Sequence, residues 1–100
     1  MARPRKCKMV YAKPDVTYFK PRAIPMTELE EVELTVEEFE AIRLKDYSGR
    51  EQTEVAEEMG ISQPTLHRLL LSARKKIAEA LVEGTAIMIK GGNYSLKKKG

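Results

Sequence analysis

The chain has 100 residues, of which 42% are hydrophobic and 33% are charged, and its formal net charge is +3. A chain of this length forms one small domain with a modest core, which leaves little room for an enclosed substrate cavity. No apolar run approaches the roughly 20 residues that span a membrane. No secretory signal is visible either, so the sequence predicts a cytoplasmic protein without membrane contact.

The small net charge conceals a strong segregation of charges along the chain. Residues 1–24 carry seven basic side chains and one acidic side chain, whereas residues 25–60 carry three basic and twelve acidic ones. Residues 61–83 and 84–100 are again basic on balance. Basic ends around an acidic middle predict an anionic partner that binds at particular surfaces.

The chain has one cysteine, Cys7, and one histidine, His67. A single cysteine cannot form an internal disulfide, which fits a reducing cytosol. One cysteine and one histidine cannot build a structural zinc site, and neither a glycine-rich phosphate loop nor a Ser-His-Asp arrangement can be assembled. The sequence therefore speaks against an enzyme and predicts no metal and no cofactor.

The first 26 residues contain four prolines, which exclude a long helix there. Two stretches, Lys8–Tyr11 and Val16–Lys20, predict short strands because β-branched and aromatic residues occur in them. We expect this region to be an arm with one or two short strands.

Helical signals begin after this arm. Thr35 followed by Glu38 has the spacing of a capping box and predicts a helix over Val36–Tyr47, which Ser48–Gly49 ends. The acidic run Glu28–Glu40 is expected to be a solvated helix face turned away from nucleic acid.

Two further helices are predicted from their end signals. The second covers Gln52–Met59 and stops at Gly60. Ser62 caps the third, which continues to Glu83 and is ended by Gly84. The third helix has one apolar stripe with helical spacing: Leu66, Leu69, Leu70, Ala73, Ile77, Ala80 and Leu81.

The segment between Gln52 and Leu71 has the order of a helix-turn-helix: a short helix, a three-residue turn and a longer helix. Ala56 is small where the two helices cross, and Gly60 permits a positive φ in the turn. The wedge between the helices needs apolar residues, and the chain supplies five: Val55, Met59, Ile61, Leu66 and Leu69. The alternative is a tight corner of an ordinary helical bundle.

The predicted fold class is mainly α. It is a three-helix helix-turn-helix domain with short β-strands from the N-terminal arm and the C-terminal tail. A further strand is expected over Ala86–Ile89, followed by a Gly91–Gly92 turn. The predicted organisation is a basic arm over residues 1–33, a helix-turn-helix domain over 34–84, and a strand with a basic tail over 85–100.

Opposite the apolar stripe, the third helix begins with side chains that can read base edges in the major groove. We define these as the reading face: Gln63, Pro64, His67 and Arg68. Pro64 offers only shape, and the alternative for His67 is a solvated surface residue. A second set is predicted to bind phosphates: Gln52, Thr53, Ser62, Thr65, Arg74, Lys75 and Lys76.

The basic residues of the arm are candidates for contacts in a minor groove. They are Arg3, Arg5, Lys6 and Lys8. The alternative is a solubilising flexible end.

Several segments of the sequence resemble UPF0251, also called DUF134, a prokaryotic family of predicted DNA-binding proteins. The matching segments are Met1–Lys6, Tyr18–Pro21, Leu34–Thr35, Glu38–Leu44, Gln52–Gly60 and Gly91–Tyr94. The resemblance covers nearly the whole chain, and it implies a helix-turn-helix similar to region 4 of sigma factors.

The leading interpretation is a sequence-specific double-stranded DNA-binding protein, a transcriptional regulator that inserts the helix starting near Ser62 into the major groove. The alternative is a protein-interaction module that docks on RNA polymerase or another partner without reading DNA. Its acidic helix, Glu37–Asp46, would then contact a basic partner. An RNA-binding role is a third possibility.

A homodimer is also expected, because one helix-turn-helix covers few base pairs and such proteins commonly read two half-sites. Leu71, Ala78 and Val82 lie on one side of the third helix, away from the apolar stripe, and something apolar should cover them. We expect the chain's own strands, Val16–Phe19 and Ile87–Ile89, to fold over them. Direct helix pairing between two copies is the alternative.

Overall fold

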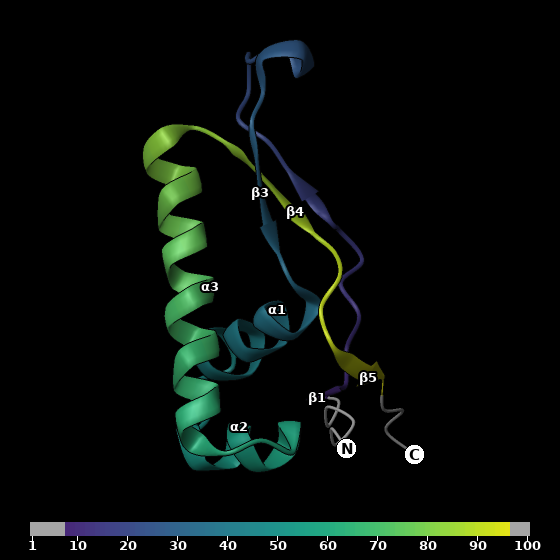
Figure 1. Cartoon of the computed structure of the whole chain (residues 1–100), viewed down its shortest axis with the longest axis vertical. Helices are drawn as coiled ribbons and strands as arrows, with labels where there is room; N and C mark the ends of the chain where they lie inside the picture. The colour runs from purple at the N-terminus through teal and green to yellow at the C-terminus, as the bar shows by residue number, and fades with distance from the viewer. Residues whose placement is uncertain (1–7, 97–100) are drawn as a thin grey trace, which may run out of the picture.

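The computed structural model describes residues 8–96. In this part of the chain, three helices and several short strands form a mixed α/β fold that is mostly helical (Figure 1). The strands are β1 (Lys8–Val10), β2 (Tyr18–Phe19), β3 (Glu31–Leu34), β4 (Ala86–Ile89) and β5 (Tyr94–Leu96). The helices are α1 (Val36–Ile42), α2 (Gln52–Met59) and α3 (Gln63–Glu83). A 3₁₀ turn (Met26–Glu28) precedes β3, and a π-helical segment (Arg43–Tyr47) continues α1.

Helices α2 and α3 begin and end where the sequence predicted, whereas the first predicted helix, Val36–Tyr47, is divided into α1 and the π-helical segment. Both hydrogen bonds of the capping box at α1 are present: the Thr35 hydroxyl accepts from the Glu38 amide, and the Glu38 carboxylate accepts from the Thr35 amide. The Ser62 hydroxyl accepts an amide of the first turn of α3. Gly60 and Gly84 end α2 and α3 with φ values of 67° and 70°, a conformation that glycine adopts without steric strain.

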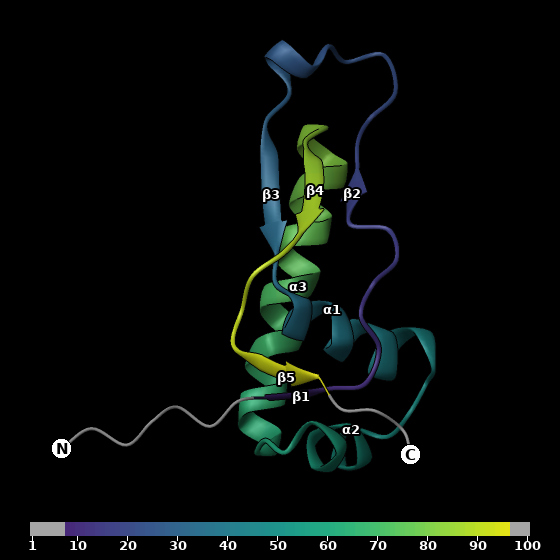
Figure 2. The same cartoon turned by 90° about the vertical axis from the view of Figure 1, so that its right-hand side faces the viewer.

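Two small sheets join distant parts of the chain. Strand β1 pairs in parallel with β5, so that Lys8 lies opposite Tyr94. In the other sheet β4 is central, antiparallel to β2 and parallel to β3. Figure 2 shows this three-stranded sheet beside the C-terminal half of α3, with the β1–β5 pair near α2. The strands predicted at β1, β2 and β4 are confirmed, whereas β3 and β5 were not predicted.

The core consists of two clusters that both include residues of α1 or the segment that continues it. One lies between α1, its π-helical continuation, α2 and α3, and contains Ala41, Leu44, Val55, Ala56, Met59, Leu66 and Leu70. The other lies where the strands meet α1 and α3, and contains Val10, Leu34, Val36, Ala73 and Ile89. Ile61 and Leu69 are partly buried against the first cluster, which confirms the predicted apolar wedge.

Two expectations for the surface of α3 were wrong. Leu81 is 78% exposed although Ala80 is buried, because one residue turns the side chain by about 100° around the helix. The predicted sheet does form, but it packs on the side of α3 that carries Ala73 and Ala80. Leu71 and Val82 therefore stay 53% and 85% exposed.

No helix within residues 8–96 is long and apolar enough to cross a membrane.

The expectation that the acidic run Glu28–Glu40 forms a solvated helix face is wrong for its members in α1. Its α1 members Glu37, Glu38 and Glu40 are buried, because each carboxylate accepts hydrogen bonds from a distant part of the chain. A buried carboxylate is tolerated when hydrogen bonds and charges satisfy it. These three side chains therefore connect elements instead of facing solvent.

Glu37 and Glu40 bind the two ends of the described chain. The Glu37 carboxylate lies 2.9 Å from the Lys8 ammonium and accepts from the Asn93 amide at 2.5 Å. The Glu40 carboxylate, fully buried, accepts from the Tyr11 amide and from the Arg43 guanidinium, both at 2.6 Å. Both carboxylates thereby attach the arm to α1.

Glu38 binds α3. Its carboxylate accepts from the Ser72 hydroxyl at 2.5 Å and from the Lys76 ammonium at 2.7 Å. Burial raises the pKa of Glu38, but the hydrogen bonds from Lys76, Ser72 and the Thr35 amide outweigh it and leave the pKa below its usual value. The ionised form is therefore favoured in the folded protein.

We predict that Ala56→Leu destabilises the fold. Ala56 is buried between α2 and α3, so the larger side chain should overpack the helix crossing at a cost of about 1–3 kcal/mol. Thermal and chemical unfolding measure the loss. Glu57→Leu, at an exposed position of the same helix, is the matched control and should unfold as the wild type does. If Ala56→Leu unfolds as the wild type does, α2 and α3 do not cross at Ala56.

Acid should weaken the attachment of α3 to α1. Because the pKa of Glu38 is lowered in the folded state, its contribution is complete above the usual pKa of 4.5 and is lost as the pH falls through the lowered value. Urea midpoints measured from pH 7 to pH 3 should therefore decrease below about pH 4.5. Glu38→Gln should reduce this decrease. If Glu38→Gln has the same acid profile as the wild type, the ionised Glu38 carboxylate does not hold α3 to α1.

Candidate nucleic-acid interface

A three-residue turn, Gly60 to Ser62, joins α2 to α3, and its conformation is fixed from two sides. The Ile61 amide donates to the Ala56 carbonyl at 2.9 Å, which closes the end of α2. Met9 of β1 lies against the turn, since a Cβ atom at Gly60 would be 3.5 Å from the Met9 methyl carbon. Strand β1 and the glycine conformation together determine the direction in which α3 leaves α2.

The reading face is exposed in all its members: Gln63, Pro64, His67 and Arg68. These residues occupy the first two turns of α3, opposite Leu66 and Leu70, which are buried. Arg68 donates to the Thr65 hydroxyl at 3.3 Å. Within residues 8–96 no carboxylate pairs with Arg68, so its guanidinium is available to a ligand.

Four of the predicted phosphate-binding residues lie in or beside the first turns of α2 and α3: Gln52, Thr53, Ser62 and Thr65. The amides of a first helical turn have no partners within the helix, and the positive end of the helix dipole favours an anion there. The Ser62 hydroxyl donates to the Thr65 hydroxyl at 2.9 Å. Thr53 and Ser62 are exposed, whereas Gln52 and Thr65 are half-buried.

The three predicted basic residues later in α3 differ from one another. Arg74 binds Asp46 with two hydrogen bonds, of 2.7 and 3.1 Å, and this contact lowers the pKa of Asp46. Lys76 binds the Glu38 carboxylate. Lys75 is exposed and has no ion pair within the described residues. Of the three, Lys75 alone presents a charge that is not already paired within residues 8–96.

Arg3, Arg5 and Lys6 lie outside the described residues, but the point at which the arm meets the fold is defined. Lys8 lines a shallow hollow of about 230 Å³ together with Arg68, Thr65 and Ser72. The arm therefore reaches the folded domain beside the reading face. Lys8 was predicted as part of the basic arm, but its place beside Arg68 was not, because one lysine in a basic arm carries no spacing signal that points to α3.

The fold is thus a small, mostly helical α/β domain in which two helices and a tight turn display an exposed polar and basic face. Residues 1–97 match the family described as "Protein of unknown function DUF134". The chain belongs to this family, DUF134 or UPF0251.

Relatives in the family are similar over nearly the whole chain. A UPF0251 protein of Thermoanaerobacter pseudethanolicus is 58% identical over 94 residues, which cover 94% of this chain and 80% of the relative. A UPF0251 protein of Caldanaerobacter subterraneus is 58% identical over 96% of this chain and 81% of its own length. One of Dehalococcoides mccartyi is 51% identical over 96% of this chain and 82% of its own. No solved structure matches the chain significantly.

Proposed function

We propose that this protein binds double-stranded DNA with sequence preference and acts as a transcriptional regulator. In this proposal α2, the turn and α3 are a helix-turn-helix, and the N-terminal half of α3 enters the major groove. The observation that carries it is the exposed reading face, which lies over an apolar wedge whose residues Val55, Met59 and Leu66 are fully buried. A polar and cationic face held on a rigid helix suits the recognition of base edges.

Each part of the interface has a chemical role. An arginine such as Arg68 pairs bidentately with guanine, and a glutamine such as Gln63 with adenine. Lys75 and the helix N-termini bind phosphates, which position the protein without reading sequence. From Lys8 back to Arg3 the chain can extend about 17 Å. That length supports a role for Arg3, Arg5 and Lys6 in an adjacent minor groove.

The alternative of docking on RNA polymerase through the acidic helix Glu37–Asp46 has less support. Glu37, Glu38 and Glu40 are buried and hydrogen-bonded, and Asp46 is paired with Arg74. The helix therefore presents little free negative charge to a basic partner. DNA is the partner whose charge fits the exposed basic groups.

Selection of bound sequences from a random duplex library tests the proposal directly. An enriched motif should appear, and the affinity for it should fall steeply with added salt because bound phosphates release counterions. A scrambled duplex of the same length is the control and should bind more weakly with a similar salt slope. Absence of any enriched motif together with salt-independent binding would reject the proposal.

Arg68→Ala should relax the preference at one base pair while leaving the fold intact. Arg68 is exposed and free of carboxylate partners within residues 8–96, and loss of a bidentate base contact costs about 1–3 kcal/mol. Binding to the selected site and to its single-base variants measures the change, with circular dichroism as the check on folding. If the preference profile does not change, Arg68 does not read the sequence.

Lys75→Ala should weaken binding to all sequences alike. Lys75 is the unpaired member of the basic group late in α3, so one phosphate contact should be lost and the salt slope should decrease by about one unit. Lys75→Arg keeps the charge and should keep the slope. A salt slope that Lys75→Ala leaves unchanged would show that Lys75 does not contact phosphate.

A further inference from the structure

The Arg68 side chain is attached to its own helix through a threonine hydroxyl. Its Nη2 atom donates a hydrogen bond to the Thr65 hydroxyl at 3.3 Å. Residues three apart are neighbours on the surface of a helix, and helical side chains lean toward the N-terminus of their helix. The Arg68 guanidinium is therefore carried back over the first turn of α3, the part that enters the major groove in the proposed function.

The Thr65 hydroxyl is itself held by the residue that caps α3. The Ser62 hydroxyl accepts from the Thr65 amide at 3.3 Å and donates to the Thr65 hydroxyl at 2.9 Å. Thr65 is half-buried, and the side chain of a β-branched residue has few rotamers in a helix. The Thr65 oxygen thus receives one donor from the cap and one from Arg68, which uses both of its lone pairs. A continuous chain of hydrogen bonds links the first turn of the helix to the arginine.

In the described part of the chain, no acidic side chain competes with Thr65 for Arg68. Glu38 lines the same hollow as Thr65 and Arg68. Its carboxylate is already satisfied, because it accepts from three other groups: the Thr35 amide, the Ser72 hydroxyl and the Lys76 ammonium. The hydroxyl of Thr65 is therefore the acceptor that orients Arg68.

Arg74 shows the different effect of a carboxylate on an arginine of the same helix. Asp46 holds Arg74 with two hydrogen bonds, of 2.7 and 3.1 Å, so the guanidinium is fixed but its charge is paired. A hydroxyl has no charge, and Thr65 therefore orients Arg68 without neutralising it. Thr65 also accepts from a single guanidinium nitrogen, which leaves the other nitrogens for a bidentate contact with a base.

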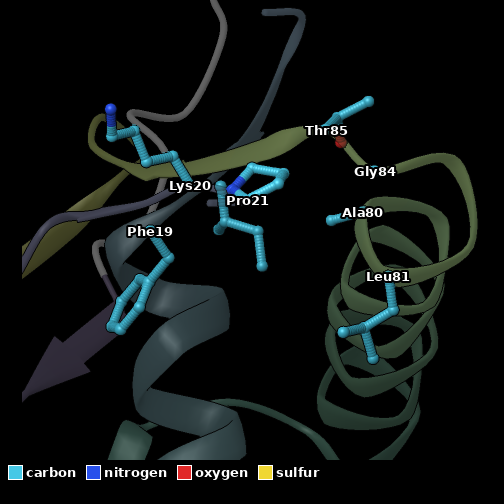
Figure 3. Close-up of a pocket in the computed structure, with 8 residues that line it drawn as sticks. Phe19, Lys20, Pro21, Ala80, Leu81, Gly84 and Thr85 are labelled. Atoms are coloured by element: carbon cyan, nitrogen blue, oxygen red, sulfur yellow. The ribbon is translucent and has the colours of Figure 1, made fainter. Parts of the chain in front are cut away.

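A cation and a threonine that only share a hollow do not form such a contact. At the other end of α3, Lys20 and Thr85 both line a hollow of about 270 Å³. Figure 3 shows the Lys20 side chain extending away from Thr85, and the buried Thr85 hydroxyl has no hydrogen-bond partner within residues 8–96. The spacing of three residues within one helix is what brings Arg68 and Thr65 together.

We propose that Thr65 is a positioning residue for Arg68, whose hydroxyl holds the guanidinium in the free protein in the orientation in which it reads a base. This inference rests on the proposed function, and it changes the role of Thr65, which the sequence placed among the phosphate-binding residues. An arginine side chain has many rotamers, and restricting them in advance reduces the entropy that is lost on binding. Thr65 thereby contributes to the base preference without touching the base.

Side-chain NMR without DNA tests the positioning itself. Relaxation of the Arg68 Nε–H group should show a more restricted guanidinium in the wild type than in Thr65→Val, because valine keeps the branched shape but accepts no hydrogen bond. Thr65→Ser restores the hydroxyl and should restore most of the order. Arg74, held by Asp46, is the internal reference and should not change. Equal mobility of Arg68 in the wild type and in Thr65→Val would overturn the inference, whether or not the protein binds DNA.

Binding to the selected DNA site and to its single-base variants tests the consequence. Thr65→Val should reduce the discrimination at the base pair that Arg68 reads by about two- to tenfold, the effect of one hydrogen bond, and should keep the salt slope. Thr65→Ser should keep most of the discrimination. In an Arg68→Ala background, Thr65→Val should cause no further loss at that base pair, because the two residues act as one unit.

Two results would count against Thr65 in different ways from a failure of DNA binding. A uniform loss of affinity in Thr65→Val, with a salt slope reduced by about one unit, would make Thr65 a phosphate contact and overturn the inference. Additive losses in the double variant would overturn it as well. Failure to select any DNA motif would instead reject the proposed function, and the NMR comparison would still decide whether Thr65 holds Arg68.

Discussion

Three buried carboxylates on one short helix hold this small fold together. In α1, Glu37 binds Lys8 and Asn93. Glu38 binds Ser72 and Lys76 of α3. Glu40 binds Tyr11 of the arm. A seven-residue helix is not stable in isolation, and a chain of this size has a modest apolar core. Hydrogen bonds to ionised groups are stronger than those between neutral groups, and low polarity strengthens them further. The relative placement of arm, tail and α3 therefore depends on α1.

The same bonds determine which positive charges the protein can present. Glu38 binds one side of α3 through Ser72 and Lys76, while Asp46 binds Arg74. Two of the three cations in the Arg74–Lys76 run thus contribute to the architecture. The reading face, earlier in α3 and turned away from these contacts, remains open. Lys8, paired with Glu37, lies beside Arg68 in the fold although the linear sequence places the two residues far apart.

The helices could be predicted from the sequence because their signals are local: the Thr35–Glu38 capping box, the Ser62 cap, and the glycines at 60 and 84. Strands β3 and β5 could not, since each is defined by pairing with a distant strand. The burial of Glu37 and Glu40 was missed for the same reason, because their partners lie far away in sequence. Most of the reading face follows from helical periodicity, whereas the place of Lys8 depends on tertiary contacts.

The parallel pairing of β1 with β5 has a consequence for the order in which the molecule forms. Lys8 pairs opposite Tyr94, nearly the full length of the described chain away. On the ribosome the N-terminal residues emerge first, so β1 has no partner until the last strand has been made. The three helices, whose contacts are closer in sequence, can assemble earlier. The pairing of β1 with β5 is therefore a late event, whereas the contacts of the arm with Glu37 and Glu40 of α1 can form before β5 has been made.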